Sequence, residues 1–145
     1  LYFASCGVSA SASTSGGAIS ATGSGLMHLW KIALANSSFE SNTANTEGGA
    51  LALFGDTANV AAYSAKLESC EFTSNAVATN QGSRGGAIAA KDCRFKLSSC
   101  AFQANRGQVG SALYYTGIAA SPLSTIEHLS TMHIANLFLS WMWLI

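Results

Sequence analysis

Charge is scarce in this sequence. Asp, Glu, Lys and Arg make up only 10% of the 145 residues, and acidic and basic residues balance at seven each. Soluble domains usually carry about 25% charged residues. Because nucleic-acid binding needs a surplus of Lys and Arg on one face, we expect no nucleic-acid partner.

Carboxylates suited to catalysis are also few. The two aspartates, Asp56 and Asp92, hold different positions in the repeating unit of the chain, and Glu40, Glu68 and Glu71 form no cluster of like charge. Glycoside hydrolysis needs two carboxylates that face one sugar, and calcium-dependent sugar chemistry needs several oxygen ligands. We therefore expect no catalytic residues, no metal and no cofactor. The alternative is a fragment of a pectate-lyase-like, carbohydrate-active enzyme.

What the sequence does contain is a repeat. Three segments align without gaps, and they cover residues 30–42, 63–75 and 93–105. Each segment has a Leu five residues before a Phe, a small residue two before that Phe and an Asn three after it. The resulting Phe-x-x-Asn motifs begin at Phe39, Phe72 and Phe102. A weaker fourth copy lies at the start of the chain.

A second motif follows each copy of the first. It is a glycine pair followed by Ala and an aliphatic residue, and glycine pairs favour sharp corners with positive φ. The apolar runs between Gly, Asn, Ser and Thr are short, which favours strands over the longer amphipathic segments of helical repeats. The glycine motifs begin at Gly16, Gly48 and Gly85, with a degraded form at Gly110.

These patterns predict an all-β fold. We expect a right-handed parallel β-helix, a solenoid of about four coils over residues 1–118, with one coil per repeat. Equivalent residues of adjacent coils then lie about 4.8 Å apart. At a tight corner Asn is favoured because it tolerates a left-handed backbone and because its amide can bond to the next copy. We expect two ladders: Phe39, Phe72 and Phe102 stacked inside, and Asn42, Asn75 and Asn105 stacked at a corner.

The cysteines follow the same repeat. Cys6, Cys70 and Cys100 hold one position of the repeating unit, and Ser37 holds it in the remaining unit. In-register parallel strands keep such side chains near the strand spacing, which is a little wide for an unstrained disulfide. We therefore expect Cys70 and Cys100 to form a ladder of buried thiols. A disulfide between them is the alternative.

One corner carries an insertion. Nine residues separate Asn75 from Gly85, whereas four or five separate the corresponding positions of the other units. Inserted loops on one face of a solenoid are frequent binding surfaces. A tolerated surface insertion without function is the alternative, because longer loops cost little free energy. The candidate contact residues are Thr79, Asn80, Gln81 and Arg84.

The last segment, residues 119–145, changes character. Ser124 and Glu127 match a capping box, and the apolar residues that follow recur at helical spacing, which predicts a C-terminal apolar helix. The apolar run 134–145 is shorter than the ~20 residues of a membrane span. We expect a helix that caps the open end of the solenoid; a truncated membrane anchor and out-of-family sequence are the alternatives. A cap would bury Leu129, Met132 and Leu137.

The two alternating motifs resemble the repeats of the polymorphic outer membrane proteins of chlamydiae. The resemblance implies a β-helical segment at the cell surface or in a secreted protein, used for adhesion or host contact. We therefore interpret the chain as a non-catalytic adhesive or structural spacer segment of a larger protein. The implied partner is a host-cell or glycan surface, and a membrane only if the C-terminal segment continues as an anchor.

Overall fold

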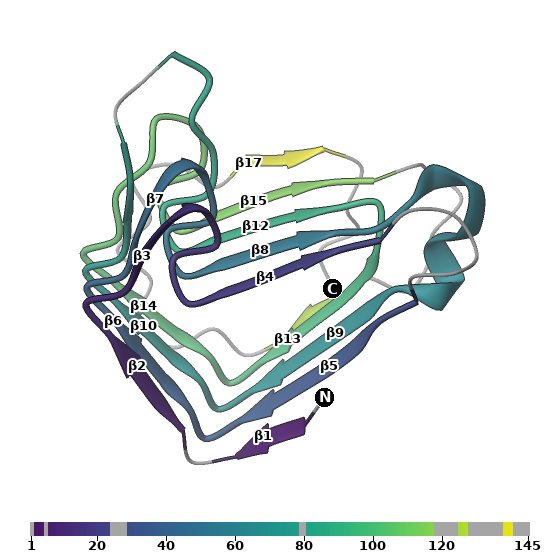
Figure 1. Cartoon of the computed structure of the whole chain (residues 1–145). Coiled ribbons are helices and arrows are strands. Elements are labelled where there is room, and N and C mark those ends of the chain that lie inside the picture. The colour runs from purple at the N-terminus through teal and green to yellow at the C-terminus, as the bar shows by residue number, and fades with distance from the viewer. Residues whose placement is uncertain are drawn as a thin grey trace.

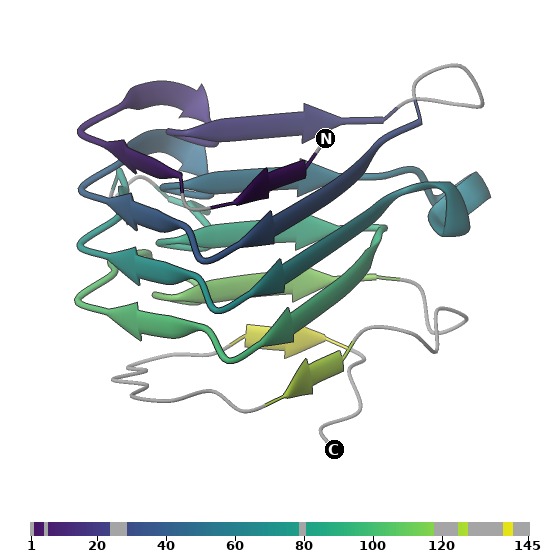
Figure 2. The ribbon, with the colours of Figure 1, turned by 90° about the horizontal axis from the view of Figure 1, so that it is seen from below.

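Each repeat forms one coil of short strands, and the coils stack with every strand parallel to its neighbours (Figures 1 and 2). The computed structural model describes residues 2–4, 6–23, 29–78, 81–117, 125–127 and 138–140. The coils wind right-handedly from the N-terminal coil, at the top of Figure 2, toward the C-terminal strands at the bottom. The predicted parallel β-helix is therefore confirmed.

The strands belong to four sheets, which we name A to D. Sheet A has the order β1 (Tyr2–Ala4), β5 (Lys31–Ala35), β9 (Ser64–Glu68), β13 (Arg94–Ser98) and β16 (Thr125–Glu127). Sheet B contains β2 (Gly7–Ser9), β6 (Ser38–Glu40), β10 (Glu71–Thr73) and β14 (Ala101–Gln103). Sheet C contains β3 (Ala12–Ser15), β7 (Thr43–Glu47) and β11 (Ala76–Val77). Sheet D contains β4 (Ile19–Thr22), β8 (Leu51–Phe54), β12 (Ile88–Lys91), β15 (Leu113–Thr116) and β17 (Phe138–Ser140). A 3₁₀ helix, η1 (Thr57–Ala62), joins β8 to β9.

Sheet A shows why these segments form strands. Side chains of β5 alternate between inside and outside, so that Ile32 and Leu34 are buried while Lys31 is exposed. The register places Leu34, Leu67 and Leu97 in one buried row across β5, β9 and β13. Burial of such apolar area stabilises the stack by about 25 cal/mol per Å².

Each coil turns at residues with a left-handed backbone. Between sheets C and D this residue is the first glycine of the pair, as predicted: φ is between 63° and 66° at Gly16, Gly48, Gly85 and Gly110. Between sheets B and C it is the residue before the ladder Asn: Ser41, Ser74 and Ala104 have φ of 54°, 56° and 53°. The prediction that the Asn residues themselves adopt this backbone was wrong, because their amides reach along the stack and the preceding residue makes the turn.

The second glycine of the pair allows close approach of adjacent coils. A Cβ atom on Gly49 would lie 2.0 Å from the carbonyl oxygen of Gly86 in the next coil. Real Cβ contacts are far longer, and the three nearest atoms, on Gly86 and Ala76, all belong to the main chain. A side chain at this position would therefore force two coils apart.

The C-terminal segment differs from the prediction. Thr125–Glu127 and Phe138–Ser140 are strands β16 and β17, which pair with β13 and β15, so the helix predicted across these residues was wrong. The physical reason is the exposed edge of a parallel stack, whose unpaired N–H and C=O groups can bind a further strand. In this pairing Ile126 is in register with Leu97. The coil that contains Tyr114 and Tyr115 is thus followed by strands of a fifth.

The remaining C-terminal predictions concern residues that the structure does not describe. Ser124 of the expected capping box falls outside the described residues, as do the residues expected in the cap, Leu129, Met132 and Leu137.

Candidate functional site

The phenylalanines of the first motif form one stack inside the solenoid. The ring centroids of Phe39 and Phe72 are 5.0 Å apart with planes at 7°, and those of Phe72 and Phe102 are 5.0 Å apart at 9°. All three side chains are buried. Their spacing follows directly from the register of β6, β10 and β14, which pairs each Phe with the next.

The asparagines of the same motif form a hydrogen-bonded ladder. Oδ1 of Asn75 accepts hydrogen bonds from the backbone N–H and from Nδ2 of Asn42, both at 3.0 Å. Nδ2 of Asn75 in turn donates to the carbonyl oxygen of Phe39 at 2.9 Å and to Oδ1 of Asn105 at 3.1 Å. Asn42 and Asn75 are fully buried. Each amide therefore satisfies main-chain groups that the corner would otherwise leave unpaired.

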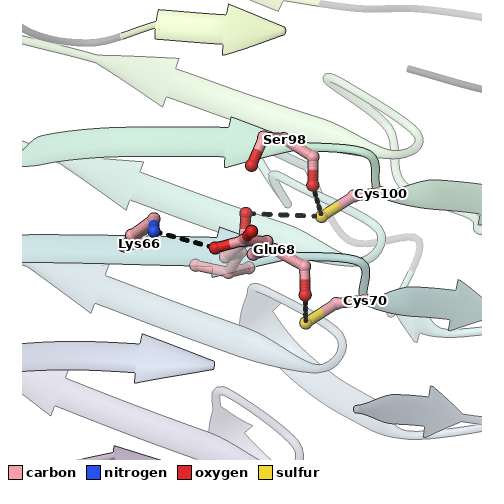
Figure 3. Close-up of polar contacts among 6 residues, drawn as sticks. Lys66, Glu68, Cys70, Ser98 and Cys100 are labelled. Carbon is pink, nitrogen blue, oxygen red and sulfur yellow. Dashed lines mark hydrogen bonds and ion pairs between the residues drawn. The ribbon is translucent and has the colours of Figure 1, made fainter. Parts of the chain in front are cut away.

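Cys70 and Cys100 form a ladder of thiols, and none of the four cysteines is in a disulfide. The Sγ atom of Cys70 donates to the carbonyl oxygen of Glu68 at 3.4 Å, and that of Cys100 donates to Ser98 at 3.4 Å (Figure 3). Ser37 repeats this contact with an oxygen, since its Oγ donates to the carbonyl of Ala35 at 2.8 Å. The position therefore needs a small side chain that can donate two residues back along the chain.

Contact between neighbouring thiols, together with burial, gives the buried cysteines different pKa values. The hydrogen bond with the thiol of Cys100 lowers the pKa of Cys70, whereas the same contact, together with burial, raises the pKa of Cys100. Burial raises the pKa of the remaining core thiol, Cys93, to about 12. All three are fully buried, so the ladder packs as small apolar side chains do.

The candidate contact loop is only partly described, because Thr79 and Asn80 lie outside the described residues. Gln81 is exposed. The backbone N–H of Gly82 donates to Oε1 of Gln108 at 2.8 Å, which ties the loop to the next coil. The hydroxyl of Ser83, in contrast, is buried without a hydrogen-bond partner among the described atoms.

Arg84, the cation of this loop, is engaged with the solenoid. Its guanidinium lies 3.6 Å from the carboxylate of Glu47 in the preceding coil and 5.1 Å from the ring centroid of Tyr114 in the following one. Its side chain remains 43% exposed. Arg84 therefore links three coils, a role that the sequence did not indicate.

The two aspartates come closer together than their sequence positions suggest. Lys91 is in register with Phe54, so Asp92 leaves β12 where Asp56 and η1 follow β8. Burial raises the pKa of Asp92, and the negative charge of Asp56 adds to the effect. Oδ1 of Asp56 accepts the N–H of Ala58 at 2.9 Å and caps η1. No group of three or more metal-ligating side chains occurs in the part of the chain that the structure describes.

Comparison with known families finds a match for part of the chain. Residues 36–53 match the model of the Chlamydia polymorphic membrane protein (Pmp) repeat. The chain carries a Pmp-type repeat. The matched segment includes Phe39, Asn42 and the glycine pair that begins at Gly48, so it contains one copy of each motif. The Pmp-type repeat thus corresponds to most of one coil, and the ladders join it to equivalent residues of its neighbours.

Two other comparisons give no match: neither a curated protein nor a solved structure is significantly similar to the chain. No helix within the described ranges has the length and apolar character of a membrane span.

Proposed function

We propose that the chain is a non-catalytic segment of a cell-surface or secreted protein, in which the β-helix acts as a spacer and as an adhesive surface. The observation that carries this proposal is that the repeated side chains contact other coils of the same chain. The Phe and Asn of each motif contact the equivalent residues of the adjacent coils. The repeat therefore builds a rod, and outward side chains and loops are left to contact a partner. The Pmp-type repeat supports placement at a surface.

The loop of residues 76–84 is the proposed contact surface of this rod. Its described residues, 76–78 and 81–84, reach further outward than the same corner of the neighbouring coils (Figure 1). Gln108 and Glu47 hold its second half, through Gly82 and Arg84. A loop with a fixed base loses less conformational entropy when it binds a partner than a freely moving loop does.

Surface placement is tested on intact cells of the producing organism. Antibodies raised against the purified chain should label these cells without permeabilisation, and externally added protease should remove the label. Labelling that appears only after permeabilisation would contradict the proposal.

Adhesion is tested with beads that are coated with the purified chain and incubated with cultured host cells. In the matched variant, residues 76–84 are replaced by the five residues of the equivalent segment of the preceding coil, β7 (Thr43–Glu47). This variant should keep the circular dichroism spectrum and lose bead attachment. Attachment equal to that of the original chain would exclude the loop as the contact surface.

Absence of catalysis is tested with polygalacturonate and neutral glycans, with and without calcium. We expect no turnover in any of these assays. Turnover that disappears in Asp92→Asn would establish the carbohydrate-active alternative instead.

A further inference from the structure

The outer face of sheet A collects most of the basic residues of the chain. Four of the seven Lys and Arg residues lie on three neighbouring strands of this sheet. Their side chains point outward, because the residues that alternate with them, such as Leu34, Leu67 and Phe95, fill the core. The basic residues of the outer face of sheet A are Lys31, Lys66, Arg94 and Lys96.

The register arranges these cations in two rows that run along the solenoid axis. Lys31, Ser64 and Arg94 are in register and form the first row. The second row contains Tyr2, Ala33, Lys66 and Lys96. Neighbours within a row are separated by the strand spacing of about 4.8 Å. Because the strands hold the rows in register, the spacing of the Cα atoms that carry these side chains is fixed before any ligand arrives.

The second row also has an aromatic end. Tyr2 is 70% exposed, and the small side chain of Ala33 separates it from Lys66 in the register. A shallow hollow of about 160 Å³ lies farther along the face, where Ser64, Lys66, Arg94 and Lys96 line it. The face therefore offers an aromatic ring, hydroxyl groups and cations in one continuous strip.

Glu68 and Glu127 share one row of the register beside these cations, and the structure describes the side chain of Glu68. Glu68 lies two residues after Lys66 on β9, and its carboxylate is 2.8 Å from Nζ of Lys66 (Figure 3). This contact raises the pKa of Lys66 and lowers the pKa of Glu68. Both side chains are about half exposed, so water screens the pair and a competing anion can reach Lys66.

We propose that the outer face of sheet A binds a linear acidic polysaccharide. A polymer with carboxylate or sulfate groups at regular intervals can contact several cations at once when they stand in fixed rows. The exposed ring of Tyr2 can pack against the apolar face of a sugar, and the hydroxyls of Ser64 and Ser98 can exchange hydrogen bonds with sugar hydroxyls. The inference rests on the proposed surface placement, which decides whether the chain meets such a polymer.

A lipid headgroup layer fits this face less well. The hollow lies between the side chains of β9 and β13, where a single extended polymer can enter and a flat membrane surface cannot. Amphipathic membrane binding also needs apolar side chains that insert below the headgroups. Tyr2 is the large apolar or aromatic side chain that is exposed on the described part of this face.

The test measures binding of the full chain to immobilised heparin and to polygalacturonate, with neutral dextran as the uncharged probe. The chain should bind both acidic polymers, and binding should weaken as salt rises. The double variant Lys66→Gln/Lys96→Gln should bind about tenfold more weakly, which corresponds to about 1.4 kcal/mol. Glu68→Gln should bind more tightly, because it removes the competing carboxylate.

The matched control is Lys91→Gln/Arg106→Gln, which removes the same charge from exposed positions outside sheet A. It should bind within twofold of the original chain. An equal loss in both double variants would reduce the effect to net charge and overturn the inference. So would the absence of binding to either acidic polymer, or binding only to phosphatidylserine vesicles.

This test is independent of the proposed function. The purified chain can bind heparin even if antibodies fail to label intact cells, in which case the surface proposal alone fails. Surface labelling without polymer binding contradicts only the inference about sheet A.

Discussion

Asn42 and Asn75 share a single oxygen: the backbone N–H and the side-chain amide of Asn42 both donate to Oδ1 of Asn75, each at 3.0 Å. The same pattern joins Asn75 to Asn105, at 2.9 and 3.1 Å. One side-chain atom thus satisfies two donors of the adjacent coil inside the protein. The corner of the solenoid is held by this ladder as well as by strand pairing.

Substitution of the central amide should therefore be costly. In Asn75→Ala the two donors of Asn42 lose their acceptor and the carbonyl of Phe39 loses a donor. Because each unsatisfied buried polar group costs about 1–3 kcal/mol, we expect a loss of about 3–5 kcal/mol, measured by urea unfolding. The control is Asn42→Ala at the other end of the ladder, which leaves unpaired the N–H of Ser11 and the carbonyl of Val8 on partly buried residues and should cost less. Equal losses at the two positions would contradict a ladder whose strength depends on burial.

The central ring of the phenylalanine stack should be similarly sensitive. Phe72 packs between Phe39 and Phe102, so Phe72→Ala leaves a cavity with rings on both sides. The expected loss is about 3–5 kcal/mol, whereas Phe72→Leu keeps most of the volume and should lose less than about 1.5 kcal/mol. Chemical denaturation followed by circular dichroism measures both. A similar loss in both variants would show that the site does not depend on filled volume.

The glycine pair offers a steric test with an internal control. Gly49→Ala places a methyl group 2.0 Å from a main-chain oxygen, whereas a Cβ on Gly7 meets no atom within 4 Å. Neither residue has a positive φ, so the two substitutions differ in space rather than in backbone strain. We expect Gly49→Ala to cost more than about 3 kcal/mol and Gly7→Ala to change stability by less than about 0.5 kcal/mol. Thermal unfolding that ranks them in the opposite order would contradict the close approach of the coils.

Asp92 should make stability depend on pH. Burial raises its pKa above the ordinary value of 3.8, so the folded state holds this proton more tightly than the unfolded state does. The protonated carboxyl of Asp92 therefore favours the folded state at low pH. This contribution to the free energy of unfolding is lost as pH rises through the raised pKa. Asp92→Asn should stabilise the protein at about pH 7, and the gain should shrink toward about pH 3, where the original carboxyl is protonated.

The control for this prediction separates the effect of the backbone conformation at Asp92 from the effect of its charge. Asp92 has φ of 50°, a left-handed conformation that Asn accepts and Ala resists. Asp92→Ala should therefore be less stable than Asp92→Asn at every pH. A gain for Asp92→Asn that is independent of pH would assign the effect to the backbone and not to the charge.

Much of the fold could be predicted from the sequence because the repeat is aligned with the register. The Phe and Asn positions of the motif are the positions that stack. Because each repeat contains one motif and forms one coil, equivalent residues of adjacent repeats lie next to each other. The details of the corner could not be predicted in the same way. The residue with the left-handed backbone is Ser41, which precedes Asn42. The reason is visible only in the hydrogen bonds of the structure, in which the Asn amides bond to the adjacent coils.

Other features depend on packing that no motif marks. The segment that contains Ile126 has an apolar pattern compatible with a helix, but the open edge of β13 provides a partner for a strand. Balanced net charge also concealed the cations of sheet A. Lys66 and Lys96 occupy one column of the aligned repeats, so comparison of columns, rather than of totals, would have found them.

The register of the ladders has a consequence for how such a chain can change in length. The coil of Phe72 and Asn75 presents a Phe and an Asn to the coil before it and to the coil after it, as Phe72 does to Phe39 and Phe102. Recombination between two Phe-x-x-Asn sites would therefore add or delete a whole coil and leave both new neighbours matched. Each added coil would lengthen the rod by about 4.8 Å and extend the rows of sheet A by one position. The length of the solenoid and the number of positions in the rows of sheet A would then change together.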